Sequence, residues 1–319
     1  MLVRRCNLNC LNVLMMKWRE NKMKKLLNTI ITLGLIITMS ACSSSTQDTT
    51  NTMAEYEKPT LELSNAGGQL KAILDKGTLV IATSPDYPPA EFVDEEGNIY
   101  GSEIELAKYV ASCLGVELQI ETMDFNGTLV AIDTGKVDMA FSGYGWKKDR
   151  AELYELSVGY SGNDIDYGHT LITLAEDVDN YKTLEDFVGK TVMCQASSLQ
   201  QMYVEDQILT LDGANSDDMS LVTSLDQAIL GLSSGKCDAV ALDEQTAKNY
   251  VTQSEGQFAL TNIMFDLSIY GDYEGNVAAA KKGETDLINA VNEVISFAMD
   301  KGYYAKWYAE ACEIAGVEG

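Results

Sequence analysis

Two segments a hundred residues apart carry residue types that could bind a small charged molecule between them. Gly135-Lys-Val-Asp-Met-Ala140 recurs as Gly235-Lys-Cys-Asp-Ala-Val240, and each copy follows an amphipathic stretch and opens an apolar run. The repetition predicts two similar α/β units, each with its own sheet. The segment after the first copy is cationic and ends at Arg150, whereas Asp243 follows the second. Ligands of such sheets bind beyond the carboxyl ends of the strands, so a cleft with Arg150 on one wall and Asp243 on the other would suit a zwitterion.

Motifs for catalysis and metal binding fit the sequence poorly. Gly231-Leu-Ser-Ser-Gly235 has the GxSxG spacing, but it ends a helix and precedes a strand, whereas a nucleophile elbow needs a strand, a turn and then a helix. Acids from Asp94 to Glu105 match several positions of a calcium loop, yet Ile99 stands where that loop requires glycine. We therefore predict neither an enzyme nor a bound metal or cofactor.

The elements that must position these residues alternate along the chain from Gln69 onward. The pattern predicts strands at 78–83 and 116–120, a hairpin that joins 91–93 to 99–100 through a turn at 94–98, and helices at 103–114 and 128–134. His169, the single histidine, lies in an expected strand and is interpreted as structural. Strands that alternate with helices predict an α/β fold with mostly parallel sheets flanked by helices.

Charge excludes one broad class of partner. The chain carries 48 acidic and 23 basic residues. Seven of the basic residues lie before residue 42, so the remainder has 16 basic and 47 acidic groups, a net charge of −31. A body this acidic repels phosphate backbones, and we predict no nucleic-acid partner.

The first 41 residues indicate export and not a folded unit. Lys22, Lys24 and Lys25 precede a mainly apolar stretch at 26–39, which is short for a membrane span and suits the core of a signal peptide. Met39-Ser-Ala-Cys42 resembles the bacterial lipoprotein signal, in which cleavage leaves a lipidated cysteine. We expect residues 1–41 to be an extension plus signal peptide, with translation from either Met1 or Met23, and an ordinary secretory signal is the alternative.

Cys42 would then carry the lipid, and residues 42–65 would form a flexible tether at the extracytoplasmic face of the membrane. Four cysteines remain in the body, far apart and without CxxC spacing: Cys113, Cys194, Cys237 and Cys312. Apolar surroundings favour buried thiols for most of them, and one disulfide stays an alternative.

Several motifs in order along the chain resemble one family. They are the segment 77–97 around Ser84-Pro-Asp-Tyr-Pro-Pro-Ala-Glu-Phe92, and the segments 101–108, 123–127, 143–150, 183–192 and 238–244. This ordered set is similar to the amino-acid-binding proteins of ABC importers, which are bacterial extracellular solute-binding proteins with the two-lobed type II periplasmic fold. The likeness covers about residues 69–310, and the set is far more specific than any one motif.

The resemblance assigns roles to individual residues. Arg150 matches the arginine that clamps the α-carboxylate of the ligand, and a guanidinium suits a carboxylate through two parallel charge-assisted bonds. Ser142 and the Gly143 backbone match further carboxylate donors, and Asp243 matches the acid that takes the α-ammonium. Asp243 also fits the N-cap of a helix at 244–250, and Arg150 could instead pair with Glu152.

The same resemblance places other side chains around the rest of the ligand. Tyr87 and Phe125 match aromatic residues that sandwich the ligand side chain, and core packing is their alternative role. Gln195 and Ser198 correspond to the loop of the second lobe that closes over the ligand.

Departures from the family pattern bear on which amino acid binds. Gly145 removes a hydroxyl that usually reaches the carboxylate, and Trp146 replaces an aliphatic residue. Ser84 stands where many members carry an aspartate that reads a polar or basic side chain, and Ala90 replaces a usual phenylalanine. These changes disfavour lysine, arginine or histidine as the ligand. The segment 162–167 is about four residues longer than expected.

The resemblance implies a monomeric, membrane-tethered protein that delivers an amino acid to the permease and ATPase of an ABC importer. Lobe one would comprise 66–162 and 275–319, and lobe two 163–274, with two crossing strands as the hinge. Two alternatives stay open. One is an enzyme on the same fold, similar to cyclohexadienyl dehydratases, with Glu91 or Glu103 as the proton donor although neither has an evident partner. The other is a ligand-sensing subunit.

Overall fold

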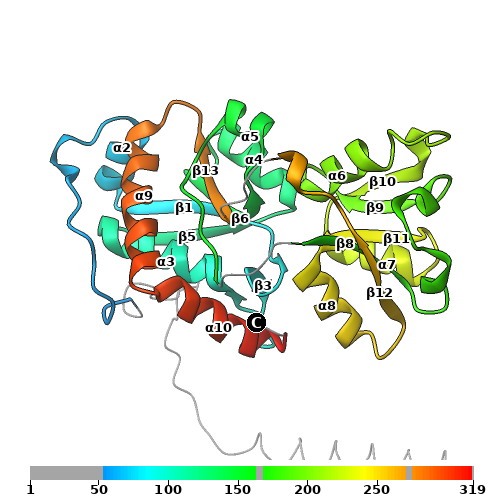
Figure 1. The fold of residues 1–319 in the computed structure, drawn as a ribbon. Coiled ribbons are helices and arrows are strands. Elements are labelled where there is room, and N and C mark those ends of the chain that lie inside the picture. The colour runs from blue at the N-terminus through cyan, green and yellow to red at the C-terminus, as the bar shows by residue number, and fades with distance from the viewer. Residues whose placement is uncertain (1–52, 163–167, 271–274, 318–319) are drawn as a thin grey trace, which may run out of the picture. The chain divides into compact units, whose positions relative to one another are not determined.

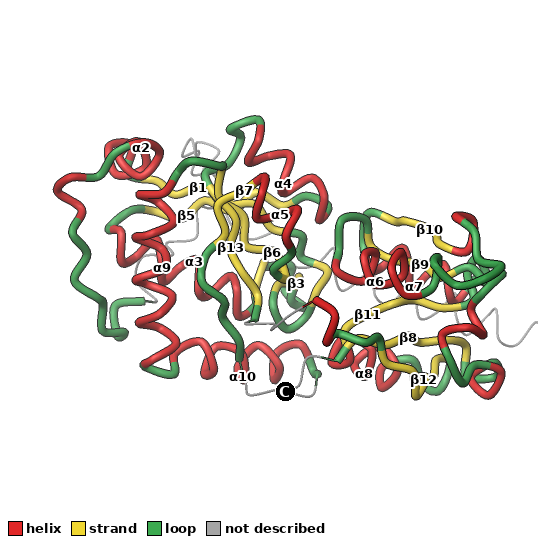
Figure 2. The backbone as a smooth tube through the Cα atoms, turned by 45° about the horizontal axis from the view of Figure 1, so that its top comes forward, coloured by secondary structure: helices red, strands yellow, loops and turns green. Residues whose placement is uncertain are grey.

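The computed structural model describes residues 53–162, 168–270 and 275–317. The predictions for the signal peptide and for Cys42 lie outside these residues. The flexible tether predicted at 42–65 is wrong from residue 53 onward, because Met53 is buried in a hydrophobic core and Tyr56 packs against it. Within the ranges described, no helix has the length and apolar character that a bilayer span requires. Figures 1 and 2 show two separate groups of strands, each with helices packed around it.

The first sheet has five strands in the order β5 (Glu117–Thr122), β1 (Thr78–Thr83), β6 (Met139–Gly145), β13 (Asn276–Lys281) and β7 (Tyr154–Leu156). Strand β1 runs parallel to both β5 and β6, while β13 is antiparallel to both of its neighbours. Four of the five strands therefore share one direction, in agreement with the predicted mostly parallel sheet.

Helices cover both faces of this sheet. On one face, Leu79 and Ile81 of β1 pack into a core together with four helices: α2 (Gly68–Lys76), α3 (Ser102–Leu114), α9 (Thr285–Asp300) and α10 (Tyr303–Ala315). Ala82 and Ala140 face the opposite side and pack against α4 (Phe125–Asp133). Apolar residues on both faces are the pattern of strands that are buried between helices.

The second sheet repeats this plan. Its strands lie in the order β10 (Met219–Val222), β9 (Val192–Gln195), β11 (Ala239–Asp243), β8 (His169–Leu174) and β12 (Phe258–Met264). Strand β8 alone runs against the other four. Helix α6 (Leu199–Gln207) packs on one face, and α7 (Leu225–Ser233) and α8 (Glu244–Gln253) pack on the other.

The chain changes sheet twice. Strand β7 ends at Leu156 in the first sheet and β8 begins at His169 in the second, and the chain returns between Met264 and Asn276. The reversed strand of each sheet is the first strand after a change of sheet. A bridge joins Tyr160 of the first connection to Asn276, the first residue of β13. The exact lobe limits at 162–163 and 274–275 stay a prediction.

The internal repeat has the same structural role in both sheets. Gly135 and Gly235 both adopt φ +69°, a left-handed conformation that glycine tolerates, directly after a helix. The Asp138 carboxylate then accepts a hydrogen bond from the Val80 N–H at 2.8 Å, and Asp238 accepts one from Thr191 at the same distance. Each repeated aspartate thus fixes its strand beside the neighbouring strand, and the predicted pair of similar units is confirmed.

Local signals define most other elements. The predicted hairpin is formed by β3 (Glu91–Val93) and β4 (Ile99–Tyr100), and β2 (Asp86–Tyr87) adds a third antiparallel strand. The helix predicted at 128–134 begins three residues earlier, because Asp124 caps it by accepting from the Gly127 N–H. The four body cysteines are free thiols. The remaining short helix, α5 (Lys148–Leu153), follows the carboxyl end of β6.

Candidate ligand-binding site

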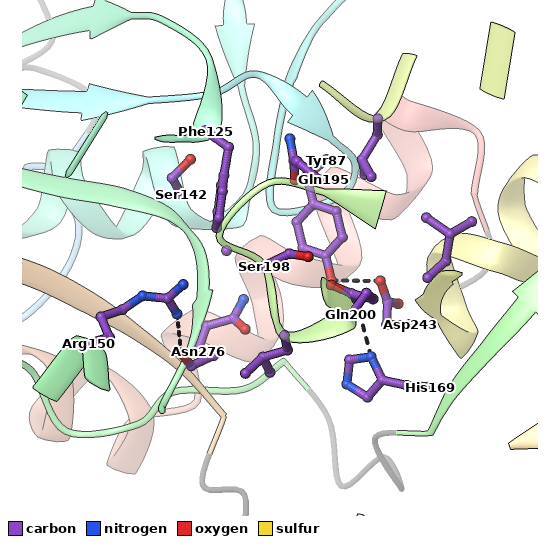
Figure 3. Close-up of a pocket in the computed structure, with 15 residues that line it drawn as sticks. Tyr87, Phe125, Ser142, Arg150, His169, Gln195, Ser198, Gln200, Asp243 and Asn276 are labelled. Carbon is purple, nitrogen blue, oxygen red and sulfur yellow. Dashed lines mark hydrogen bonds between the residues drawn. The ribbon is translucent and has the colours of Figure 1, made fainter. Parts of the chain in front are cut away.

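A cavity receives side chains from elements of both sheets (Figure 3). One wall comes from β6 and β13 of the first sheet, from helices α4 and α5, and from β2 of the small three-stranded sheet: Tyr87, Phe125, Ser142, Gly143, Gly145, Arg150 and Asn276. The other wall comes from elements of the second sheet: His169, Gln195, Ser198, Leu199, Gln200, Leu225, Leu242 and Asp243. Strands β6, β9 and β11 contribute through their carboxyl ends, where α/β sheets bind ligands.

Arg150 is the basic side chain of the cavity, and only 2% of it is exposed. Its guanidinium donates to the carbonyls of Gly145 and Ser197, the second at 2.7 Å, and stacks 5.0 Å from the Tyr144 ring. The Gly145 bond lies within the first sheet, whereas Ser197 belongs to the loop after β9. A buried, oriented guanidinium is a strong site for a carboxylate.

Asp243 ends β11 on the opposite wall. One carboxylate oxygen accepts from the Thr246 N–H at 2.9 Å and so caps α8, and the other accepts from the Tyr87 hydroxyl at 2.8 Å. The N-cap role is therefore present. The bond to Tyr87 leaves this carboxylate facing the cavity, where a ligand cation could be bound.

The loop between β9 and α6 closes the cavity from the second sheet. Ser198 caps α6 through its hydroxyl, which accepts from the Gln201 N–H. Ser197 adopts φ +67°, an unfavourable conformation for a residue with a side chain. This conformation turns the Ser197 carbonyl to Arg150 and its hydroxyl to Asn126, 2.9 Å away. The sequence contains no signal for this strained residue.

Ser142 and Gly143 line the cavity, but their donors are already used within the protein. The Gly143 N–H donates to Glu103 at 3.0 Å, and the Ser142 hydroxyl lies in hydrogen-bonding reach of Glu91 while it accepts from the Ser84 N–H. The sequence interpretation gave these donors to the ligand without assigning their partners.

Ser84 and Trp146 are the two predicted site residues that do not line the cavity. Ser84 is buried, and its hydroxyl donates to Asp86 at 2.9 Å. Trp146 lies one residue beyond β6 and 48% of it is exposed, because the chain turns outward there to begin α5.

Asp86 was missed by the sequence reasoning, although it lies two residues from Ser84. Its carboxylate accepts from the Leu225 N–H, the first residue of α7, at 2.9 Å and from Gln195 at 3.3 Å. Burial raises the pKa of Asp86, and the nearby charge of Asp226 adds to that shift. This acid therefore links the small sheet to the helix that covers the second sheet.

His169, Gln200 and Asn276 also line the cavity without having been predicted as site residues. Gln200 Nε2 lies 3.2 Å from His169 Nδ1, and the ring packs edge-on against Tyr203. Burial lowers the pKa of His169 to about 4, so the ring is neutral at pH 7. Its packing fits the structural role predicted for it.

Behind the cavity lie two buried carboxyl groups. Glu103 is 0% exposed and Glu91 is 1% exposed. Burial raises the pKa of Glu103 to about 7, and burial together with the charge of Glu103 raises the pKa of Glu91 well above its usual range. The sequence interpretation found no partner for either residue, and for Glu91 this was wrong, because the charge of Glu103 raises its pKa.

Comparisons with known proteins agree with this geometry. Residues 79–312 match the profile of the family described as bacterial extracellular solute-binding proteins, family 3. The L-cystine-binding protein TcyJ of Escherichia coli K12 is 25% identical over 72% of this chain and 80% of its own length. The arginine-binding extracellular protein ArtP of Bacillus subtilis is 26% identical over 72% of this chain and 84% of its own length.

Solved structures show the same architecture. The amino acid ABC transporter substrate-binding protein AbpA of Streptococcus pneumoniae, bound to L-arginine, is 30% identical. It matches with a TM-score of 0.68 over 78% of this chain and all of that chain. An ancestral amino-acid-binding protein, AncCDT-1, described as a precursor of cyclohexadienyl dehydratase, is 26% identical, with a TM-score of 0.64 over 76% of this chain and 99% of its own. The predicted type II periplasmic fold is confirmed, and the chain belongs to the bacterial extracellular solute-binding proteins of family 3.

Proposed function

We propose that this protein is the extracytoplasmic substrate-binding component of an ABC importer, that it captures an amino acid between its two lobes, and that it delivers the ligand to a permease. The observation that carries the proposal is the cavity in which buried Arg150 from the first sheet and Asp243 from the second face the same space. Opposite charges on opposite walls match the two ends of a zwitterion. Among the relatives named above, one is an L-cystine-binding protein and two bind arginine.

In this proposal Arg150 holds the α-carboxylate and Asp243 holds the α-ammonium, while Tyr87 and Phe125 flank the side chain. Gln195 and Ser198 cover the ligand from the second lobe. A ligand that contacts both walls stabilises the closed arrangement through contacts that the open one lacks. The two connections between the sheets, at 157–168 and 265–275, would act as the hinge, and the permease would recognise the closed form.

A thermal-shift screen of residues 43–319 tests the proposal, with the twenty amino acids, cystine and small dicarboxylates as ligands. A ligand at 100 times its Kd adds about 2.7 kcal/mol to the free energy of unfolding and raises the Tm. We expect one or a few amino acids to stabilise the protein. L-cystine is the first candidate, and L-arginine, which two of the relatives bind, is the second, because Ser84 stands where an aspartate would read a basic side chain. No shift with any zwitterion would contradict the proposal.

Arg150→Ala separates binding at this cavity from binding elsewhere. Loss of the guanidinium leaves a ligand carboxylate buried and unpaired, which should weaken binding by about 2–5 kcal/mol in calorimetry. Lys148→Ala removes an exposed positive charge from the same helix and should bind as the unchanged protein does. Equal affinities for Arg150→Ala and Lys148→Ala would exclude Arg150 as the carboxylate site.

An enzyme similar to cyclohexadienyl dehydratases is the second candidate, favoured by the likeness to AncCDT-1 and by the raised pKa values of two carboxyl groups. Glu91 and Glu103 lie behind Gly143 and are not among the residues that line the cavity, which places them poorly for proton donation to a ligand. Turnover of prephenate or arogenate by the purified protein would support the enzyme over the binding protein.

A further inference from the structure

Gly143 lies between two carboxyl groups at the wall of the cavity. Its N–H donates to Glu103 Oε2, and the other oxygen of Glu103 accepts from Asn276 Nδ2 at 2.9 Å. On the other side, a Cβ atom placed on Gly143 would lie 3.3 Å from Glu91 Oε1. Gly143 and Asn276 both line the cavity, so the two acids directly support its wall from behind.

The surroundings of the two acids are short of positive charge. Among the residues described, neither Glu91 nor Glu103 forms an ion pair, and Glu91 Oε2 has no hydrogen-bond partner. The titratable side chains whose charges act on them come from β2, β6 and the first connection between the sheets: Asp86, Tyr144 and Tyr160. Arg150 acts on Tyr144 and lies on the cavity side.

Two negative charges in this buried space would repel each other strongly, and a proton shared by the pair removes that cost. The ionised form of Glu103 is stabilised by donors from Gly143 and Asn276 and by the Tyr160 hydroxyl, whereas Glu91 has only the Ser142 hydroxyl. The proton therefore belongs mainly on Glu91.

Two of these donors, from Ser142 and Gly143, are those that the proposed ligand carboxylate needs. We propose that Glu91 and Glu103 are positioning residues that share one proton, hold the Ser142 hydroxyl and the Gly143 N–H, and release these donors to a ligand carboxylate as the pair becomes less charged. This inference rests on the proposed function and adds to it a coupling between amino-acid binding and proton uptake.

The sign of the coupling follows from charge. A carboxylate ligand adds a negative charge beside the pair, so the bound protein holds protons more tightly than the free protein. Affinity therefore falls as the pH rises through the range in which the pair loses its proton. His169 does not share this range, since burial lowers its pKa to about 4.

The first experiment measures the Kd of the amino acid found in the screen between pH 6 and 8.5. We expect the affinity of the unchanged protein to fall about tenfold, the change that one pKa unit of linkage produces. Glu91→Gln keeps the shape of the side chain and removes the group that gains and loses the proton, and its affinity should vary less than twofold over the same range. A flat profile for the unchanged protein, or an equally steep one for Glu91→Gln, would overturn the coupling and leave the proposed function standing.

Glu105→Gln is the matched control. Glu105 lies in the same helix as Glu103, but its carboxylate pairs with Lys108 at 2.6 Å. This variant should keep the pH profile of the unchanged protein. If Glu105→Gln flattened the pH dependence of affinity as much as Glu91→Gln does, the dependence would come from the overall charge of the protein and not from Glu91 and Glu103.

The second experiment needs no ligand, and its titration curves come from the unchanged protein. Carboxyl carbon resonances of the glutamates, labelled with ¹³C, are followed in the free protein from pH 4 to 9. We expect a resonance that titrates above pH 6, assigned by its loss in Glu91→Gln or Glu103→Gln. Ordinary titration near pH 4.5 for every glutamate would refute the shared proton, even if the screen identified no ligand and the proposed function itself failed.

Discussion

At the scale of single residues, the cavity depends on a position where no side chain fits. Gly143 adopts φ +59°, and a Cβ there would lie 2.7 Å from the Tyr87 ring and 3.3 Å from Glu91. The first contact is shorter than real Cβ contacts, so Tyr87 would have to move. Because the Tyr87 hydroxyl donates to Asp243, such a movement would also disturb the opposite wall.

Gly143→Ala should therefore lower the free energy of unfolding by about 2 kcal/mol or more, through the backbone conformation and the clash together. Gly135→Ala is the control, since Gly135 has φ +69° but nothing within 4 Å of an added Cβ. It should show the backbone cost alone, about 1 kcal/mol. Urea unfolding of the two variants makes the comparison. If Gly143→Ala lowered the free energy of unfolding no more than Gly135→Ala does, Tyr87 would be able to move away from the added Cβ at little cost.

The residue scale also shows where the sequence was informative. Arg150 and Asp243 were predicted to share a cleft because each follows the apolar strand that one copy of the repeat opens. Both residues line the cavity. Asp86 could not be predicted, because its backbone partner Leu225 is 139 residues away and no local pattern joins them. The donors of Ser142 and Gly143 were assigned to the ligand because their acceptors, Glu91 and Glu103, lie in other elements.

At the scale of elements, the fold follows local signals closely. Strand β1 and the hairpin of β3 and β4 have the predicted limits, because β-branched runs and a polar turn define them within a few residues. Helix starts were less accurate where a cap decided them, as Asp124 does for α4. The direction of each strand could not be predicted from local signals, because it depends on the long connections between the sheets, after which β8 and β13 run opposite to their neighbours.

One contact between elements carries a prediction. Asp86 in β2 accepts from the N–H of Leu225, the first residue of α7, a donor that has no partner within the helix, while the N-cap Ser224 accepts from Gln227. The negative charge also lies favourably at the N-terminus of the helix. This hydrogen bond joins the small sheet to the second lobe without involving the proposed ligand.

Asp86→Ala should weaken amino-acid binding about tenfold, the worth of one hydrogen bond to a charged group, although Asp86 lies outside the cavity lining. Small-angle scattering with saturating ligand should show a larger radius of gyration than for the unchanged protein. Asp226→Ala removes an exposed acid from the same turn of α7 and should change neither quantity. Unchanged affinity in Asp86→Ala would show that this bond does not contribute to closure.

At the scale of the whole molecule, the predicted export signal and the acidic body differ in charge. Seven basic residues and one acid lie before residue 42, and the acidic body follows, as expected if a signal peptide is removed and the body stays in an exported space. We propose that Cys42 carries the lipid that keeps the protein at the membrane.

Cys42→Ala tests the anchor in cells. The unchanged protein should take up labelled palmitate and sediment with membranes, and Cys42→Ala should take up none and appear in the soluble exported fraction. Cys10→Ala, a change upstream of the expected signal, should behave as the unchanged protein. Incorporation of palmitate into Cys42→Ala would place the lipid elsewhere.

The order of the strands has a consequence for synthesis. Strand β6, at the centre of the first sheet, pairs with β13, and more than 130 residues of chain separate Met139 from its partner Ala280. The second sheet uses only strands between His169 and Met264, so it is complete before β13 emerges from the ribosome or from an export channel. The first lobe stays unfinished until almost the last residues have crossed. Pairing over such a sequence separation is slow, and this delay would help the chain remain unfolded and threadable during export.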